Sequence, residues 1–82
     1  MVSPRFRIRS IYDVPIIKLI LDNLDYELVQ PDFDQSKLFN VKDKMVSYDI
    51  EIIDILDGYG VSIEGEEEYV SSITSLFLER IP

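Results

Sequence analysis

Three arginines alternate with apolar residues near the start of the chain. Arg5, Arg7 and Arg9 are separated by Phe6 and Ile8. Alternate residues of a strand point to one face, so the three guanidinium groups share one side of a half-buried strand. Guanidinium groups bind carboxylates and phosphates through a planar fork. We expect them to pair within the chain, because it holds 16 acidic and 8 basic residues. A protein surface and a nucleic-acid backbone are the two alternatives.

A second group of charges is an acidic run in the second half of the chain. It consists of Glu64, Glu66, Glu67 and Glu68. The last three precede an amphipathic helical pattern, and we expect them in its first turn, where the helix dipole favours anions. Adjacent carboxylates at a helix start point in different directions, so we predict no metal site here. The run remains available to a basic partner.

A third pattern follows the spacing of oxygen ligands in a calcium loop. Its members are Asp32, Asp34, Ser36, Leu38, Asn40 and Asp43. Lys37 stands where such a loop needs glycine for its sharp turn, and Pro31 would disrupt an entering helix. We therefore expect an Asp-rich loop whose side chains cap local turns, with no bound metal.

Composition excludes most catalytic chemistry. The 82 residues include no histidine and no cysteine, which removes the commonest general base and all thiolate or disulfide chemistry. No serine has a histidine partner, and no glycine-rich phosphate loop is present. We expect no enzyme and no cofactor.

The net charge of −8 repels phosphate and makes nucleic acid an unexpected partner. No apolar run reaches membrane-span length and no signal-peptide pattern follows the arginines, so we expect a cytoplasmic protein without a membrane partner.

Periodicity supplies the elements that must position these residues. Asp13 marks a helix start with Pro15 in its first turn, and the final helix carries an apolar stripe. Residues 43–58 fit either a strand or a helix, and the helical spacing of Ile52, Ile55 and Leu56 favours a helix. The expected order is a strand at 5–9, a helix from 13, strands at 26–30 and 37–41, a helix within 43–58, a strand at 61–63 and a helix through 69–77.

This order predicts a single α+β domain over residues 1–82. Its first six elements, β-α-β-β-α-β, match the ferredoxin-like plan, and the C-terminal helix is an addition. That helix either covers the open face of the sheet or forms an interface with another chain.

The segment from Asp13 to Leu24 resembles the first loop and helix of small-molecule-sensing ACT domains. These domains usually carry Pro-Gly in the loop, whereas Pro15 is followed here by Ile16. The resemblance implies a ligand pocket near residues 13–16, usually at a dimer interface.

Taken together, the sequence predicts a small acidic, non-enzymatic protein-interaction module with an accessory, regulatory or inhibitory role. Its partner is expected to be a protein with a basic surface, and a homodimer is a further expectation, because a small domain gains core by pairing. The alternatives are an ACT-like sensing domain and a nucleic-acid binder using the arginine strand. The candidate partner-binding residues are Glu64, Glu66, Glu67, Glu68, Leu78, Ile81, Arg5, Arg7 and Arg9.

Overall fold

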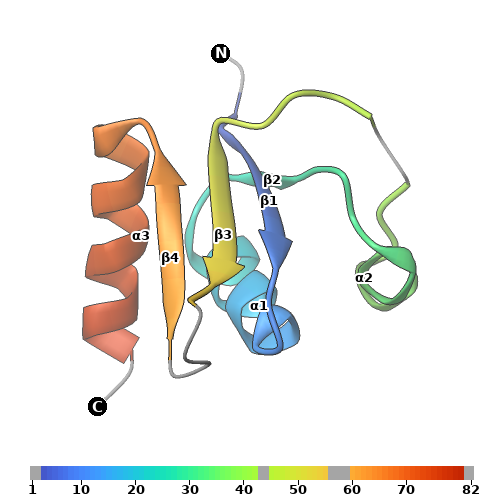
Figure 1. Ribbon diagram of the computed structural model, residues 1–82, viewed down its shortest axis with the longest axis horizontal. Helices are drawn as coiled ribbons and strands as arrows, with labels where there is room; N and C mark the ends of the chain where they lie inside the picture. Colours follow the sequence, from blue (N-terminus) through green and yellow to red (C-terminus); the bar gives the residue numbers. More distant parts are fainter. Residues whose placement is uncertain (1–2, 43–44, 56–59, 81–82) are drawn as a thin grey trace.

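The computed structural model describes residues 3–42, 45–55 and 60–80 (Figure 1). These residues form an α+β fold with a four-stranded mixed sheet and three helices, which confirms the predicted class. The elements are β1 (Arg5–Arg9), α1 (Asp13–Asn23), β2 (Glu27–Leu28), α2 (Phe33–Phe39), β3 (Ile50–Asp54), β4 (Val61–Gly65) and α3 (Glu67–Arg80).

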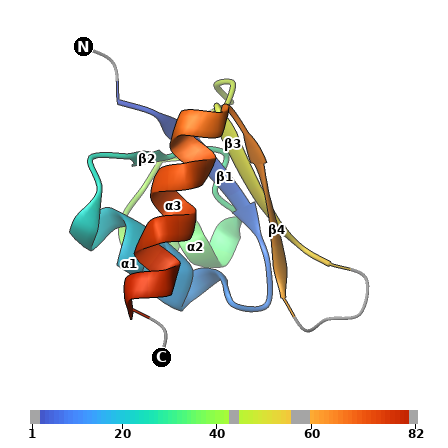
Figure 2. The same ribbon diagram turned by 90° about the vertical axis from the view of Figure 1, so that its left-hand side faces the viewer.

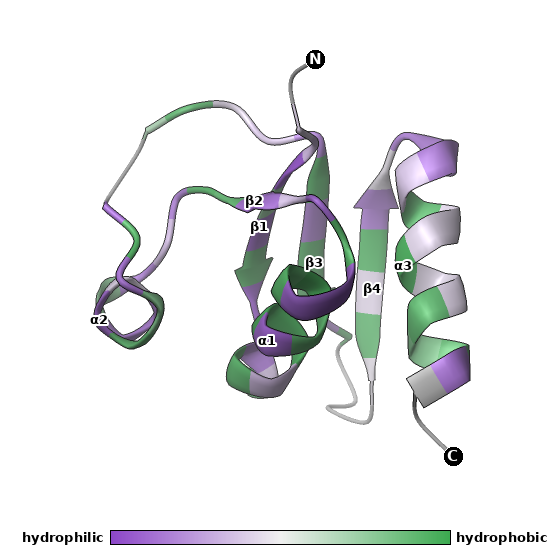
Figure 3. Ribbon diagram, turned by 180° about the vertical axis from the view of Figure 1, so that it is seen from behind, coloured by the Kyte–Doolittle hydropathy of each residue, from purple (hydrophilic) through white to green (hydrophobic). Residues whose placement is uncertain are grey.

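The strands lie in the order β2-β1-β3-β4. Strand β1 pairs in parallel with β2 on one side and with β3 on the other, while β3 and β4 are antiparallel. Helix α1 lies over one face of the sheet (Figure 3), and α3 lies along β4 on the same side of the sheet, as Figure 2 shows. Helix α2 lies beyond the β1–β2 side, and no helix of the described chain covers the opposite face.

The core lies between the sheet and the two covering helices. It is built from alternate residues of the central strands and from the inward stripes of α1 and α3. Its fully buried members include Phe6, Ile8, Ile50, Ile52, Ile17, Ile20 and Ile73. Full burial of one such side chain stabilises the fold by roughly 1.5–3 kcal/mol. Because Phe6 and Ile8 face this core, the arginines of β1 must face the other way.

The preferred helix within residues 43–58 is wrong for the part that the structure describes. Residues 50–54 form strand β3, with Ile50 and Ile52 fully buried. Both sides of β3 are paired, by β1 and by β4, so non-local hydrogen bonds outweigh the helical spacing. Leu56, which belonged to the predicted helix, lies outside the described residues.

The predicted strand at 37–41 is also wrong, because residues 33–39 form helix α2. Asp32 caps this helix: its carboxylate accepts a hydrogen bond from the Gln35 backbone N–H at 2.8 Å, and the Gln35 side chain accepts one from the Asp32 N–H at 3.4 Å. This reciprocal capping box satisfies donors at the helix start, and Asn40 ends the helix in a left-handed conformation.

The ferredoxin-like arrangement is not confirmed, because the sheet is mixed and its order is β2-β1-β3-β4. The ferredoxin-like expectation depended on a strand at 37–41 and a helix within 43–58. The structure has helix α2 and strand β3 in these segments, so the element order differs. The strand at 5–9, the helix from Asp13, the strand at 61–63 and the final helix are confirmed. In the final helix, Ile73 and Leu76 are buried as its stripe predicts.

Candidate functional site

The arginines of β1 lie on the sheet face that the helices leave uncovered. Arg7 forms an ion pair with Glu51 of β3, its register partner across the parallel ladder. Glu51 is in turn the register partner of Glu64 on β4. Register partners in neighbouring strands share a face, so a row of one arginine and two glutamates crosses the open face.

The other two arginines are also tied to the chain around them. The Arg9 guanidinium donates hydrogen bonds to the carbonyl oxygens of Gln30 at 2.6 Å and Ile8 at 2.9 Å. The Arg5 backbone N–H donates to the Asp49 carboxylate at 2.9 Å, and the Arg5 carbonyl accepts from the Asp49 N–H at 2.8 Å. The Arg7 guanidinium thus pairs with a carboxylate, as the excess of acids predicted, whereas the described partners of the Arg9 guanidinium are backbone carbonyl oxygens.

The predicted acidic run is divided between two surfaces. Glu64 belongs to β4 and the open sheet face, whereas Glu67 and Glu68 occupy the first turn of α3. Glu66 directly precedes that helix, and its carbonyl accepts hydrogen bonds from the N–H groups of Tyr69 and Val70, both at 3.0 Å. All four glutamates are exposed. The structure thus confirms the expected first-turn position for Glu67 and Glu68 and sets Glu64 apart.

Two tyrosines meet beside the start of α3. The rings of Tyr26 and Tyr69 pack edge to face, with centroids 6.0 Å apart and planes at 76°. Partial burial raises the pKa of Tyr69, and the nearby carboxylates of Glu66, Asp49 and Glu68 raise it further. We call Tyr26, Asp49, Glu66, Glu68 and Tyr69 the acidic-aromatic edge.

Gly65 allows a close backbone contact between the end of β4 and Asp49. It ends β4 with φ at +154°, a conformation that residues with a Cβ rarely adopt. A Cβ at Gly65 would lie 2.3 Å from the backbone oxygen of Asp49. The absent side chain therefore lets the start of β3 approach the turn into α3 and brings Asp49 beside Tyr69.

Sequence reasoning missed Tyr26 and Asp49 as site residues and assigned Tyr69 only to the core stripe. A signal was present, because each tyrosine of the pair adjoins acidic residues in the chain. Asp25 and Glu27 flank Tyr26, and Glu68 precedes Tyr69. A tyrosine flanked by acids is a candidate for cation binding, since both its ring face and its neighbours attract positive charge.

The remaining predicted site residues lie elsewhere. Leu78 is 78% exposed on α3, and Ile81 lies outside the described residues. In the segment with calcium-loop spacing, Asp32 caps α2, and the Ser36 hydroxyl donates a hydrogen bond to the Val41 carbonyl. Among the residues that the structure describes, no three His, Cys, Asp or Glu side chains are grouped to hold a metal ion. Asp43, the last residue of the calcium-loop spacing, lies outside the described residues.

The fold and these surfaces define an α+β domain with a mixed sheet, a charged open face and an acidic-aromatic edge. No protein-family model matches this chain, and a search of the curated proteins found no match to it. Within the described ranges, every helix is too short or too polar to span a membrane.

Proposed function

We propose that this protein is a non-enzymatic cytoplasmic interaction module that binds a basic surface of a partner protein through its acidic-aromatic edge. The observation that supports this proposal is the Tyr26–Tyr69 pair with three carboxylates around it. A lysine or arginine there meets aromatic rings and anions together. A cation over an aromatic ring gains about 0.5–2 kcal/mol, and charge-assisted hydrogen bonds to carboxylates add to this.

The overall charge supports the same partner chemistry. A net charge of −8 on a chain of 82 residues creates a negative field that attracts basic proteins before contact. Such steering raises the association rate and weakens with salt. The partner is proposed from its charge alone, and an accessory, regulatory or inhibitory role is equally compatible with this surface.

The nucleic-acid alternative has less support. A phosphate backbone would need free guanidinium groups, but Arg7 is paired with Glu51 and Arg9 donates to two backbone carbonyls. Glu64 stands in the same row of the open face as Arg7. A phosphate contact to Arg7 or Arg9 would therefore have to replace an internal contact.

The proposal is tested with a defined ligand, a short lysine- and arginine-rich peptide, whose binding is measured by calorimetry at low and at physiological salt. Glu66→Gln combined with Glu68→Gln is expected to weaken binding about tenfold, the equivalent of ~1.4 kcal/mol. Glu67→Gln is the matched control, because Glu67 lies in the same turn but does not belong to the acidic-aromatic edge.

An equal loss per charge in the control would show that only net charge matters and would remove the edge from the proposal. Tyr69→Leu separates the aromatic part and should weaken the peptide further at physiological salt. Binding of a single-stranded oligonucleotide that is lost when Arg5, Arg7 and Arg9 are all changed to alanine would favour the nucleic-acid alternative instead.

A further inference from the structure

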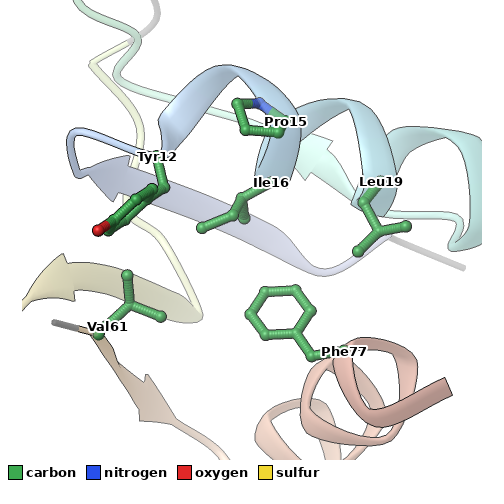
Figure 4. Close-up of a pocket in the computed structure, with 7 residues that line it drawn as sticks. Tyr12, Pro15, Ile16, Leu19, Val61 and Phe77 are labelled. Atoms are coloured by element: carbon green, nitrogen blue, oxygen red, sulfur yellow. The ribbon is translucent and has the colours of Figure 1, made fainter. Parts of the chain in front are cut away.

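A pocket opens between α1, β4 and α3, at the opposite end of β4 from the acidic-aromatic edge. Its volume is about 430 Å³. Figure 4 shows the side chains of Tyr12, Ile16 and Leu19 pointing toward Val61 and Phe77, with Pro15 above them in the first turn of α1. The residues that line it are Tyr12, Pro15, Ile16, Leu19, Gly60, Val61 and Phe77.

The topology explains why a pocket forms here. After β1, the chain adds β2 on one side of β1 and then crosses to add β3 on the other side. The strand order therefore reverses between β1 and β3. In open α/β sheets, ligands bind outside the carboxyl ends of the strands at such a point, because the connecting segments diverge there. Tyr12 follows β1 closely, and Val61 is the register partner of Asp54, the last residue of β3. The pocket therefore adjoins the carboxyl ends of both strands.

The lining selects the chemistry of the ligand. Every described side chain that lines the pocket is apolar or aromatic, and none carries a formal charge. A charged ligand would lose its hydration here without gaining a partner of opposite charge, which disfavours its binding. An uncharged apolar or aromatic molecule would be stabilised by the removal of its apolar surface from water.

The volume favours a small molecule over a single side chain of a partner protein. Pockets for small molecules enclose about 300–1,000 Å³. A cavity of about 150 Å³ already accommodates benzene, so one aromatic side chain would leave most of this pocket empty. We infer that the pocket between α1, β4 and α3 is a binding site for an uncharged apolar or aromatic small molecule. This inference does not rest on the proposed binding of a basic partner.

The test uses indole as a neutral aromatic probe and the full chain labelled for nuclear magnetic resonance. Titration is expected to shift the methyl signals of Ile16, Leu19 and Val61 saturably. Intermolecular nuclear Overhauser effects should connect indole protons with Val61 and the Phe77 ring. Val61→Phe and Leu19→Phe each fill part of the pocket and should weaken indole binding about tenfold or more.

The matched control is Leu38→Phe, which adds the same ring at a position on α2 that is 64% exposed and outside the pocket. It should leave indole affinity unchanged. The inference is overturned if the shifts do not saturate, if they centre on exposed apolar residues outside the pocket, or if neither filling variant weakens binding. If a filling variant fails to fold, the Overhauser contacts of the unchanged protein decide the matter, since their absence under saturating indole rejects the site.

Discussion

The buried side-chain amide of Gln35 donates a hydrogen bond to the carboxylate of Asp13 at 2.9 Å, although the two residues are 22 positions apart in the chain. The same amide donates to the Ile8 carbonyl at 3.0 Å. One side chain thus joins α2 to the start of α1 and to β1. Gln35→Met keeps the length of the side chain but removes its hydrogen bonds to the Asp13 carboxylate and to the Ile8 carbonyl, which keeps only the Arg9 guanidinium as a side-chain donor. We expect a loss of about 2–3 kcal/mol in the free energy of unfolding, measured with urea.

Leu38→Ala is the control for that measurement, because Leu38 lies on the same helix and is 64% exposed. It should cost less than about 0.5 kcal/mol. Equal losses in the two variants would mean that the hydrogen bonds of Gln35 stabilise the fold no more than an exposed side chain of the same helix does.

Gly65→Ala should destabilise the protein because its Cβ would lie 2.3 Å from the Asp49 oxygen and φ is +154°. The expected cost is about 1–3 kcal/mol, measured by thermal or urea unfolding. Gly60→Ala offers a comparison within the same chain, since a Cβ there meets no atom nearer than the Ile55 side chain at 3.4 Å. A Gly65→Ala protein as stable as Gly60→Ala would contradict this account of the β3–α3 approach.

Titration of Tyr69 reports directly on the acidic-aromatic edge. Because Glu66 and Glu68 raise its pKa, changing either to glutamine should lower the pKa of the phenol, followed by phenolate absorbance. Glu67→Gln should change it less. A raised pKa in the folded state stabilises the protonated form, so this contribution is present below the ordinary value of 10.0 and is lost as the pH rises through the folded pKa. The alkaline loss of stability should be smaller in Tyr69→Phe.

The Arg7–Glu51 pair is half-buried, with 25% and 20% of the two side chains exposed. A double-mutant cycle with Arg7→Met and Glu51→Gln should give a coupling of about 0.5–1 kcal/mol that shrinks at high salt. No measurable coupling would mean that these two charges are satisfied by water and would return Arg7 to the set of groups available to a partner.

Local sequence patterns predicted a strand or helix correctly where one hydrophobic periodicity dominates the segment. The alternation around Phe6 and Ile8 predicted β1, and the spacing from Tyr69 to Phe77 predicted α3, since each element buries one stripe on a common core. Asp32 and Gln35 also have the spacing of a capping box, but the calcium-loop spacing of Asp32, Asp34 and Ser36 favoured a loop in that segment.

Non-local contacts decided the rest. Ile50 and Ile52 fit a strand spacing, whereas Ile52 and Ile55 fit a helical one, and only pairing with β1 and β4 selects the strand. The acidic-aromatic edge needs Tyr26, Asp49 and Tyr69 to meet from three distant parts of the chain. Neither the strand order nor this meeting follows from a pattern within one segment.

Strand β4 fixes the spacing between the two proposed binding regions. Val61 lines the pocket at one end and Gly65 adjoins the acidic-aromatic edge at the other. Four residue steps of about 3.3 Å span roughly 13 Å. This exceeds the screening length of about 8 Å at physiological ionic strength. Charge changes at the acidic-aromatic edge should therefore alter ligand affinity in the pocket only weakly, and one small ligand cannot contact both ends of β4. A competition experiment between indole and a basic peptide should consequently find two independent equilibria, one insensitive to salt and one governed by it.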